Sequence, residues 1–311
     1  MTASLVALVA LVAHVGLLLL LPPLLLGVIN KTKAWFAGRR GPPLLQAYYD
    51  LARLFRKEMV FSETTTWMFR AGPIVTASAV LLAGMLAPFG AFDAPVRFTG
   101  DLVLFAYLLA LGRFFTTAAA LDTGSAFEGM GAAREVSFAC LAEVALFTAF
   151  VVLVRFSGAL SLTPMLHAPA QAELHGLPAA ALVLVGVALF VVLLAESARV
   201  PIDDPNTHLE LTMIHEVMVL DHSGPLFGLV LYAQAVKMFL LSSVLLHLAL
   251  PFASGRPPLD GLVFVAGTLA VAVAIGVVES VMARLRLHYV PSLLIASGVL
   301  CAFGFVLTLA R

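Results

Sequence analysis

Residues 178–195, PAAALVLVGVALFVVLLA, form a run of eighteen almost wholly apolar residues. A helix needs about 20 such residues to cross roughly 30 Å of hydrocarbon, so this run predicts a membrane-spanning helix. The residues that follow, ESARVPIDDPNTHLELTMIHE (196–216), contain five carboxylates, one arginine and two histidines. The chain therefore passes from a transmembrane helix directly into a strongly ionisable loop.

The composition of the whole chain is that of a multi-pass membrane protein. Of its 311 residues, 61% are hydrophobic and only 12% are charged, whereas a soluble domain has about 25% charged residues. Open sheets do not survive in lipid and the alternation typical of β-barrels is absent, so we expect helices. The predicted spans are 3–29, 70–92, 101–121, 134–156, 177–199, 225–250, 259–282 and 289–310. The sequence thus predicts an all-α, polytopic protein that forms a single integral membrane domain over residues 1–311.

The basic residues predict which side of the membrane each loop faces, because cytoplasmic loops carry an excess of Lys and Arg. Twelve of the eighteen basic residues fall on one side: Lys31, Lys33, Arg39, Arg40, Arg53, Arg56, Lys57, Arg70, Arg134, Arg199, Arg284 and Arg286. Only Arg97, Arg155, Arg256 and Arg311 fall on the other. Both termini should therefore lie outside, and the loop 196–216 should be cytoplasmic. The net charge of zero gives no indication of a nucleic-acid partner.

The cysteines and histidines give no pattern of a metal or redox centre. Cys140 and Cys301 lie inside apolar runs, and the chain has no CxxC motif or clustered His/Cys spacing. His14 and His247 lie well inside predicted spans, where a pair of haem ligands is one interpretation and hydrogen bonding between helices is the other. We therefore predict no cofactor and no catalytic residue in this chain.

The first notable cytoplasmic stretch is GRRGPPLLQAYYDLARLFRKE (38–58). Leu44, Tyr48, Leu51 and Phe55 follow helical spacing, which predicts a short amphipathic helix. Such a helix either lies on anionic lipid or forms a docking face for a soluble partner.

The second stretch is FEGMGAAREVSFACLAEVALF (127–147), in which two glycines precede Arg134 and Glu135 at the start of the predicted fourth span. An acid in a first helical turn can simply complement the helix dipole. Glu143 has no such explanation, because it lies about 13 Å into the predicted span at 1.5 Å per residue.

The third stretch is the ionisable loop itself. Glu196 and Arg199 are expected on one helical face, at i and i+3, and Pro201 is expected to end the helix. Residues 203–207 supply turn and capping chemistry, and residues 208–216 predict a short, partly apolar helix. The alternative is a solvated loop held by local caps.

Charges also occur within or close to the predicted spans. Arg113 lies at nearly the same depth as Glu143, Lys237 lies near mid-bilayer, and Glu279 lies near the inner end of the seventh span. An unpaired charge at the centre of a bilayer costs roughly 2.5–3.5 kcal/mol. Two hypotheses follow: static pairing between helices, or a hydrated proton path that enters near Glu196 and Glu135 and continues towards Lys237.

The three stretches GRRGPPLLQAYYDLARLFRKE, GMGAAREVSFACLAE and ESARVPIDDPNTHLELTMIHE, together with eight spans, resemble one family over nearly the whole chain. It is the membrane-anchoring subunit shared by respiratory complex I, as its NADH dehydrogenase subunit 1, and by membrane-bound NiFe hydrogenases. The resemblance implies a subunit that joins a soluble redox arm to antiporter-like membrane subunits. It also implies that the buried acids form the entrance of a proton path.

The resemblance carries over Glu196, Arg199, Pro201, Asp203 and Glu210 from the loop, and Arg134, Glu135 and Glu143 from the second stretch. With the other charges described above, the proton-path or coupling residues are predicted to be Arg113, Glu135, Glu143, Glu196, Asp203, Asp204, Glu210, Lys237 and Glu279. The residues predicted to dock the arm are Arg53, Arg56, Lys57, Arg134, Arg199, His208 and Glu216.

The loop departs from the complex I pattern. Ile202 stands where that pattern has Phe, Asn206 and His208 replace two acids, and Met218 and Val219 replace a downstream Glu-Tyr pair. PNTHLELTMIHE is instead similar to the formate hydrogenlyase and hydrogenase-4 type of membrane subunit.

We therefore predict the membrane-anchoring and coupling subunit of a formate-hydrogenlyase-like NiFe hydrogenase complex, in the cytoplasmic membrane of a bacterium or archaeon. The implied partners are the hydrogenase large and small subunits, an iron–sulfur protein, an antiporter-like membrane subunit and the lipid bilayer. Iron–sulfur clusters and a NiFe centre would lie in those partners. The alternatives are a quinone-site subunit of a complex I-like dehydrogenase, a stand-alone ion transporter and a purely structural anchor.

Overall fold

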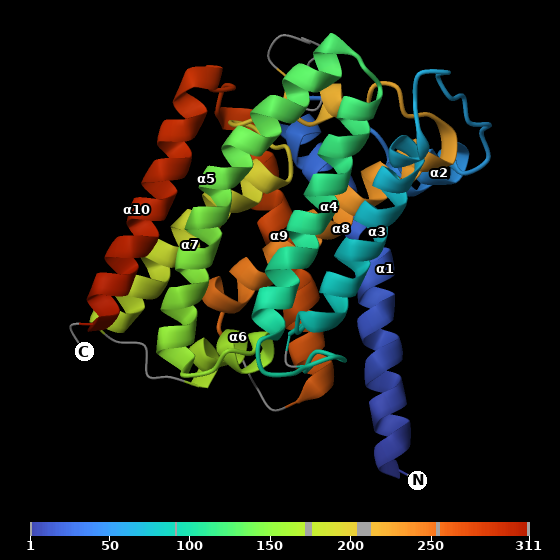
Figure 1. Ribbon diagram of the computed structural model, residues 1–311. Helices are drawn as coiled ribbons and strands as arrows, with labels where there is room; N and C mark the ends of the chain where they lie inside the picture. Colours follow the sequence, from blue (N-terminus) through green and yellow to red (C-terminus); the bar gives the residue numbers. More distant parts are fainter. Residues whose placement is uncertain (1, 91, 172–175, 204–212, 253–255, 310–311) are drawn as a thin grey trace.

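The computed structural model describes residues 2–90, 92–171, 176–203, 213–252 and 256–309, and within these ranges it contains helices and no strand (Figure 1). The helices are α1 (Thr2–Phe36), α2 (Gln46–Leu54), α3 (Trp67–Leu86), α4 (Asp101–Asp122), α5 (Ala126–Ser157), α6 (Leu162–Gln171), α7 (Leu177–Glu196), η1 (Glu216–Val219), α8 (Gly224–Ala249), α9 (Pro257–Val281), η2 (Leu287–Tyr289) and α10 (Val290–Leu309).

Eight of these helices are long and apolar enough to cross a membrane: α1, α3, α4, α5, α7, α8, α9 and α10. The short helix α2 lies beside the bundle at one end, and the first residues of α1 and the last of α10 lie at the opposite end (Figure 1). An even number of spans places both termini at one end in this way. The prediction of an all-α, multi-pass membrane protein with an additional amphipathic segment is confirmed.

Helix α8 is the centre of the bundle. Its membrane-crossing window is 72% buried, the highest value among the described spans, and it contacts α1, α3 and α7 as well as α2, α6 and α9. Around it, α3 pairs with α4, α1 pairs with α9, and α10 packs on α5 and α7. Small residues permit these close approaches. A Cβ added to Gly304 of α10 would lie 3.1 Å from Cγ2 of Val185 and 3.3 Å from the carbonyl oxygen of Ala181.

Several helices extend beyond or stop short of the predicted spans. Helix α5 begins at Ala126 rather than at 134, α1 continues through Pro22 and Pro23 to Phe36, and α3 ends at Leu86 rather than at 92. Hydropathy marks only the part of a helix that fits the hydrocarbon layer, so it misses polar turns that project beyond that layer. The extra turns of α5 matter for the site described below.

Helix α7 ends earlier than predicted, and a different feature of the chain ends it. The helix ends at Glu196, not at 199, and well before Pro201. Ala198 has a positive φ of 53°, the backbone N–H of Arg199 donates to the carbonyl of Leu194 (2.9 Å), and that of Ala198 donates to Ala195 (3.4 Å). This pattern is a Schellman motif, which closes a helix locally. The expectation that Glu196 and Arg199 share one helical face is therefore wrong.

The predicted short helix over 208–216 falls mostly outside the described residues, as do Asp204, His208 and Glu210. Met213, Ile214 and His215 are not helical, and η1 begins only at Glu216.

Candidate functional site

Arg113 of α4 is the centre of a buried ionic cluster. Its Nη2 donates hydrogen bonds to both carboxylate oxygens of Glu196, at 2.6 and 2.7 Å. Its Nη1 donates to Glu143, and its Nε lies 3.3 Å from Oε1 of Glu135. The arginine side chain is only 10% exposed. One guanidinium thus joins α4 to α5, which carries Glu135 and Glu143, and to the C-terminal residue of α7.

Lys237 of α8 adds a second cation to this cluster. Its Nζ lies 2.6 Å from Oε2 of Glu196. Glu196 is therefore held by two cations while its side chain is only 6% exposed. A buried carboxylate is tolerated when it is paired in this way. Arg113 and Lys237 are thus joined through Glu196, and Glu143 joins them through Arg113.

His215 continues the cluster towards the loop that follows α7. Its Nε2 lies 3.1 Å from Oε2 of Glu135, which is an ion-pair distance without hydrogen-bond geometry. Its Nδ1 lies 3.3 Å from Oδ2 of Asp203. Burial by itself would lower the pKa of His215, but the two flanking carboxylates, Glu135 and Asp203, raise that pKa above its usual value.

Asp203 joins the histidine to a further cation and to the backbone. Its Oδ2 accepts hydrogen bonds from the backbone N–H groups of Ile214 (3.3 Å) and His215 (3.0 Å), and its Oδ1 lies 3.1 Å from Nη2 of Arg284. Burial would raise the pKa of Asp203, but the hydrogen bonds and charge of His215, with the charge of Arg284, lower it below its usual value.

These contacts form one continuous series, which we call the ionic chain: Arg284, Asp203, His215, Glu135, Arg113, Glu143, Glu196 and Lys237. A cavity of about 50 Å³ is lined by five of its members, Arg113, Glu135, Glu196, His215 and Lys237. Since one water needs roughly 10–15 Å³ of such volume, the cavity has room for water beside the charged groups. The carboxylates and the imidazole of this arrangement are groups that can each bind a proton.

A second ionic group is centred on Glu279 of α9. Nζ of Lys33, in α1, lies 2.7 Å from Oε2 of Glu279, and Nη1 of Arg199 lies 3.2 Å from Oε1. The carboxylate side chain is fully buried. This group fixes the segment after α7 to α1 and α9.

The N-terminal turns of α5 form a platform for the loop that carries His215. A Cβ added to Gly131 would lie 3.0 Å from Cγ of Met218 and 3.1 Å from the carbonyl oxygen of Ile214, so only glycine permits this approach. Oε1 of the buried Glu128 accepts a hydrogen bond from the backbone N–H of Asp221 (3.0 Å). Nη1 of Arg134 donates to the carbonyl of Met213 (2.8 Å). These contacts position His215.

The predicted site residues therefore fall into different places. The structure brings Arg113, Glu135, Glu143, Glu196, Asp203 and Lys237 into the ionic chain and places Glu279 in the second group. Because α5 begins at Ala126, the interpretation of Glu135 as a first-turn acid is wrong, and Glu128 occupies that position.

Of the predicted docking residues, Arg53 of α2 and the following Arg56 and Lys57 are exposed. Arg134 and Glu216 are half-buried, and Arg199 is buried against Glu279.

Sequence reasoning did not assign a role to His215 or Arg284. His215 lies in the quoted loop, but its partner Glu135 is 80 residues away, and no local pattern links them. One signal was present in the sequence: the acids predicted for the coupling site outnumber its two predicted cations, Arg113 and Lys237. That imbalance indicates that cations from the loops must take part.

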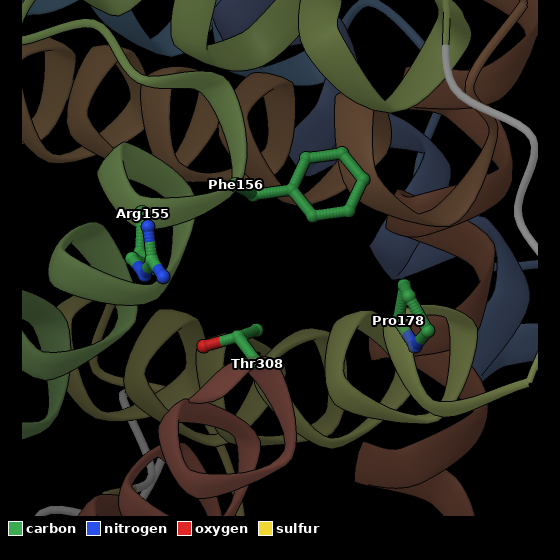
Figure 2. Close-up of a pocket in the computed structure, with 4 residues that line it drawn as sticks. All are labelled: Arg155, Phe156, Pro178 and Thr308. Carbon is green, nitrogen blue, oxygen red and sulfur yellow. The ribbon is translucent and has the colours of Figure 1, made fainter. Parts of the chain in front are cut away.

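Two other cavities lie apart from the ionic chain. One, of about 310 Å³, is lined by Arg155, Phe156, Pro178 and Thr308 (Figure 2). Arg155 and Phe156 lie near the end of α5 and Thr308 near the end of α10, and no predicted site residue lines this cavity. The other, of about 250 Å³, lies between α1, α2, α8 and the end of α7, where Gln46, Asp50, Arg199 and Gln234 are among its lining residues. Within the described ranges, no group of three or more His, Cys, Asp or Glu residues is placed to hold a metal ion.

The sequence is similar to known membrane subunits over most of its length. It is 32% identical to hydrogenase-4 component C of Escherichia coli (strain K12) over 241 residues, which are 77% of this chain and 74% of that protein. It is 28% identical to formate hydrogenlyase subunit 4 of the same organism over 304 residues, covering 93% and 94%. A subunit of the NADH-quinone oxidoreductase of Anaplasma phagocytophilum (strain HZ) is 28% identical over 256 residues, covering 74% and 72%.

The fold is also found in a solved structure. A chain of the membrane-bound sulfane sulfur reductase, an archaeal respiratory membrane complex, superposes with a TM-score of 0.82 at 21% identity, covering 97% of this chain and 99% of that one. The family model described as NADH dehydrogenase matches residues 7–310. The chain belongs to the NADH dehydrogenase family, as the three quoted stretches of its sequence indicated.

Proposed function

We propose that this protein is the membrane-anchoring and coupling subunit of a formate-hydrogenlyase-like NiFe hydrogenase complex. Its similarity to hydrogenase-4 component C and formate hydrogenlyase subunit 4 supports the type of complex. The observation that carries the coupling role is the ionic chain, which leads from Arg284 and Asp203 in the loops to Lys237 within α8.

The end of the bundle that carries α2 would face the cytoplasm and bind the soluble arm. The exposed Arg53, Arg56 and Lys57 give this end a basic surface, and cytoplasmic loops are enriched in such residues. The arm would consist of the hydrogenase large and small subunits and an iron–sulfur protein. Its iron–sulfur clusters and NiFe centre would supply the redox chemistry, and both termini of this chain would lie outside the cytoplasmic membrane.

The coupling would be electrostatic. Arrival of an electron in the docked arm changes the charge next to the loop that carries Asp203 and His215. Neighbouring charges of the ionic chain are in direct contact, and two unit charges 4 Å apart at an effective dielectric constant of about 20 interact by about 4 kcal/mol. A change of protonation at one member therefore alters its neighbours as far as Glu143. Glu143 is the least buried of these acids, with a side chain 37% exposed, so an antiporter-like subunit could accept its proton there.

The first test is the composition of the complex. An affinity tag on this chain should co-purify a nickel-containing large subunit and an iron–sulfur protein. Purification of the chain alone, or with a quinone-reducing assembly that never evolves hydrogen, would overturn the proposal.

The second test addresses the coupling residue. Glu143→Gln keeps the size of the side chain but removes its charge. In inverted membrane vesicles, the variant complex should still evolve hydrogen while proton movement falls at least tenfold. Glu63→Gln, at an exposed position, is the matched control and should change neither rate. Unchanged proton movement in an assembled Glu143→Gln complex would remove Glu143 from the path.

One observation favours a second candidate, the quinone-site subunit of a complex I-like dehydrogenase. The cavity of about 250 Å³ beside α1, α2 and α8 combines apolar residues with Gln46, Arg199 and Gln234, and it approaches the size range of small-molecule sites. Donor oxidation that depends on added quinone would favour this candidate. Donor oxidation coupled to hydrogen evolution without quinone would favour the hydrogenase.

A further inference from the structure

The imidazole of His215 faces a carboxylate on each side. Nδ1 lies 3.3 Å from Asp203, in the segment after α7, and Nε2 lies 3.1 Å from Glu135, in α5. The two carboxylates thus belong to different parts of the molecule, one to a loop and one to a membrane-spanning helix. The ring is buried, with its side chain only 11% exposed. It is the side chain through which the loop section of the ionic chain meets the membrane section.

The charges of the ionic chain balance when His215 is protonated. Arg113, Lys237, Arg284 and the imidazolium then match the four carboxylates of Glu135, Glu143, Glu196 and Asp203. A buried carboxylate is costly unless it is paired, so the two carboxylates beside His215 favour its protonated form. His215 therefore stands between two carboxylates with which it can share a proton.

The surroundings of His215 agree with this assignment. The flanking carboxylates, Glu135 and Asp203, raise its pKa, whereas Lys237 opposes that effect. Asp203 is in turn bound by Arg284, and Glu135 by Arg113. The cavity of about 50 Å³ that adjoins the ring extends to Lys237, so water beside His215 can exchange protons with its nitrogens.

We propose that His215 is the proton-transfer residue of this site and carries a proton from Asp203 to Glu135. This inference rests on the proposed coupling function and names the group that connects the loop to the membrane. A proton on Asp203 passes to Nδ1 of a ring that already holds one on Nε2, which gives the imidazolium. The Nε2–H bond then breaks as its proton passes to a water in the cavity that His215 and Glu135 both line, and this water gives up one of its own protons to form an O–H bond on Glu135. Exchange with cavity water returns the remaining proton from Nδ1 to Nε2.

The test compares amide variants in the intact complex. His215→Asn places an amide near Nδ1 and His215→Gln places one near Nε2, so each keeps polar contact with one carboxylate but neither can relay a proton at neutral pH. Both should assemble and evolve hydrogen, with proton movement into inverted vesicles reduced at least tenfold. His222→Gln is the matched control. His222 is also buried, but it stacks on Phe69 with ring centroids 4.0 Å apart and has Nε2 3.4 Å from a backbone carbonyl, so proton movement should be unchanged.

A second experiment separates proton transfer from a structural role. His215→Ala leaves a space beside the cavity, and added imidazole should restore part of its proton movement, whereas added N-methylpyrrole, which has no exchangeable proton, should not. Asp203→Asn keeps an oxygen for the backbone N–H groups of Ile214 and His215 but cannot pass on a proton, so it should show the same loss. Equal recovery with both additives would overturn the proposal.

The outcomes also distinguish this inference from the proposed function. If Glu143→Gln lowers proton movement and the His215 variants do not, His215 is not the relay but the coupling function stands. If the His215 and Glu143 variants all leave proton movement unchanged, the coupling function itself fails. If the His215 variants do not assemble, Asp203→Asn decides: an assembled complex with wild-type proton movement would exclude transfer between Asp203 and His215.

Discussion

The buried acids Glu196 and Glu279, at one end of the bundle, have a different kind of partner from the buried Asp101 at the other end. At the end that carries α2, two buried acids pair with cations: Glu196 binds Arg113 and Lys237, and Glu279 binds Lys33 and Arg199. At the opposite end, the fully buried Asp101 is held by uncharged donors. It accepts hydrogen bonds from the backbone N–H groups of Phe98 (3.2 Å) and Leu162 (2.7 Å) and from the hydroxyl of Ser161 (2.7 Å).

Four of the described histidines bind backbone carbonyl oxygens, including His222 at the α2 end, whose Nε2 lies 3.4 Å from that of Phe69. His14, His167 and His247 each place Nε2 within 3.1 Å of a backbone carbonyl oxygen, at Gly84 or Gly90, whereas His215 lies between two carboxylates. Fixed backbone groups keep one hydrogen-bond pattern, but adjoining charges change with every proton that is gained or lost. The hydrogen bonds of Asp101 therefore do not depend on the protonation of a neighbour, whereas the contacts of His215 do.

The largest loss of stability is expected from Arg113→Met. Removing the guanidinium leaves Glu143 without its ion-pair partner and weakens the pairing of Glu135 and Glu196. Breaking a buried pair in this way costs about 3–5 kcal/mol, which thermal unfolding in detergent should show as a large loss of Tm. Arg97→Met is the control, because Arg97 and Asp93 form an exposed pair worth only about 0–1 kcal/mol. Equal losses in the two variants would contradict the comparison.

A smaller loss of stability is expected from a substitution in α5 where this helix contacts the loop that carries His215. Gly131→Ala should cost about 1–3 kcal/mol through overpacking against Ile214 and Met218. Gly129→Ala, two residues earlier, meets nothing within 4 Å and should stabilise the helix by up to about 1 kcal/mol, since alanine is the better helix former. Unfolding of both variants measures the difference. A Gly131→Ala protein at least as stable as Gly129→Ala would show that the loop does not depend on this approach.

At the end with the termini, deletion of one hydrogen bond between uncharged groups should lower the free energy of unfolding by less than these two substitutions do. Ser243→Ala removes the bond from its hydroxyl to the carbonyl of Pro88 (3.2 Å), for which about 0.5–1.5 kcal/mol is typical. Ser137→Ala, on an exposed part of α5, should change stability by less than about 0.5 kcal/mol. A loss for Ser243→Ala as large as that for Arg113→Met would remove the distinction between the two ends.

The smallest effect is a pH dependence, because every side chain stays in place and only proton occupancy changes. The pKa of His215 is raised in the folded protein, so protonation of His215 stabilises the fold. This contribution is fully present below about pH 6.5, the pKa of histidine in the unfolded chain, and is lost as pH rises through the folded pKa. The pKa of Asp203 is lowered in the folded protein, so ionisation of Asp203 stabilises the fold. This contribution is fully present above about pH 3.9, the pKa of aspartate in the unfolded chain, and is lost as pH falls through the folded pKa. The pair should therefore contribute most between about pH 4 and 6.5.

Measurements of Tm from pH 4 to 9 check this dependence. His215→Asn should flatten the decline of stability on the alkaline side relative to the wild type. An identical alkaline decline in the two proteins would assign that slope to other groups.

The sequence predicted the existence of every span but not the ends that matter for the site. Its apolar runs placed all eight helices, because the free energy of insertion depends mainly on the composition of one local segment. It missed the eight additional N-terminal residues of α5, whose glycines and polar side chains resemble a loop by hydropathy. In the structure, η1 packs on this part of the helix. It also missed the Schellman closure at Ala198, where alanine takes a conformation usually left to glycine.

The sequence by itself determined that this is a helical membrane protein, and it identified Arg113, Glu143, Glu196 and Lys237 as the charges to explain. Only the tertiary structure decided which charges meet. It placed His215 between Asp203 and Glu135 and assigned Arg199 to Glu279 instead of Glu196. The hydropathy of a span depends only on neighbouring residues in the sequence, so the sequence alone reveals it. An ion pair depends on a contact of about 3 Å between side chains that lie many tens of positions apart in the sequence, and only the fold brings these together.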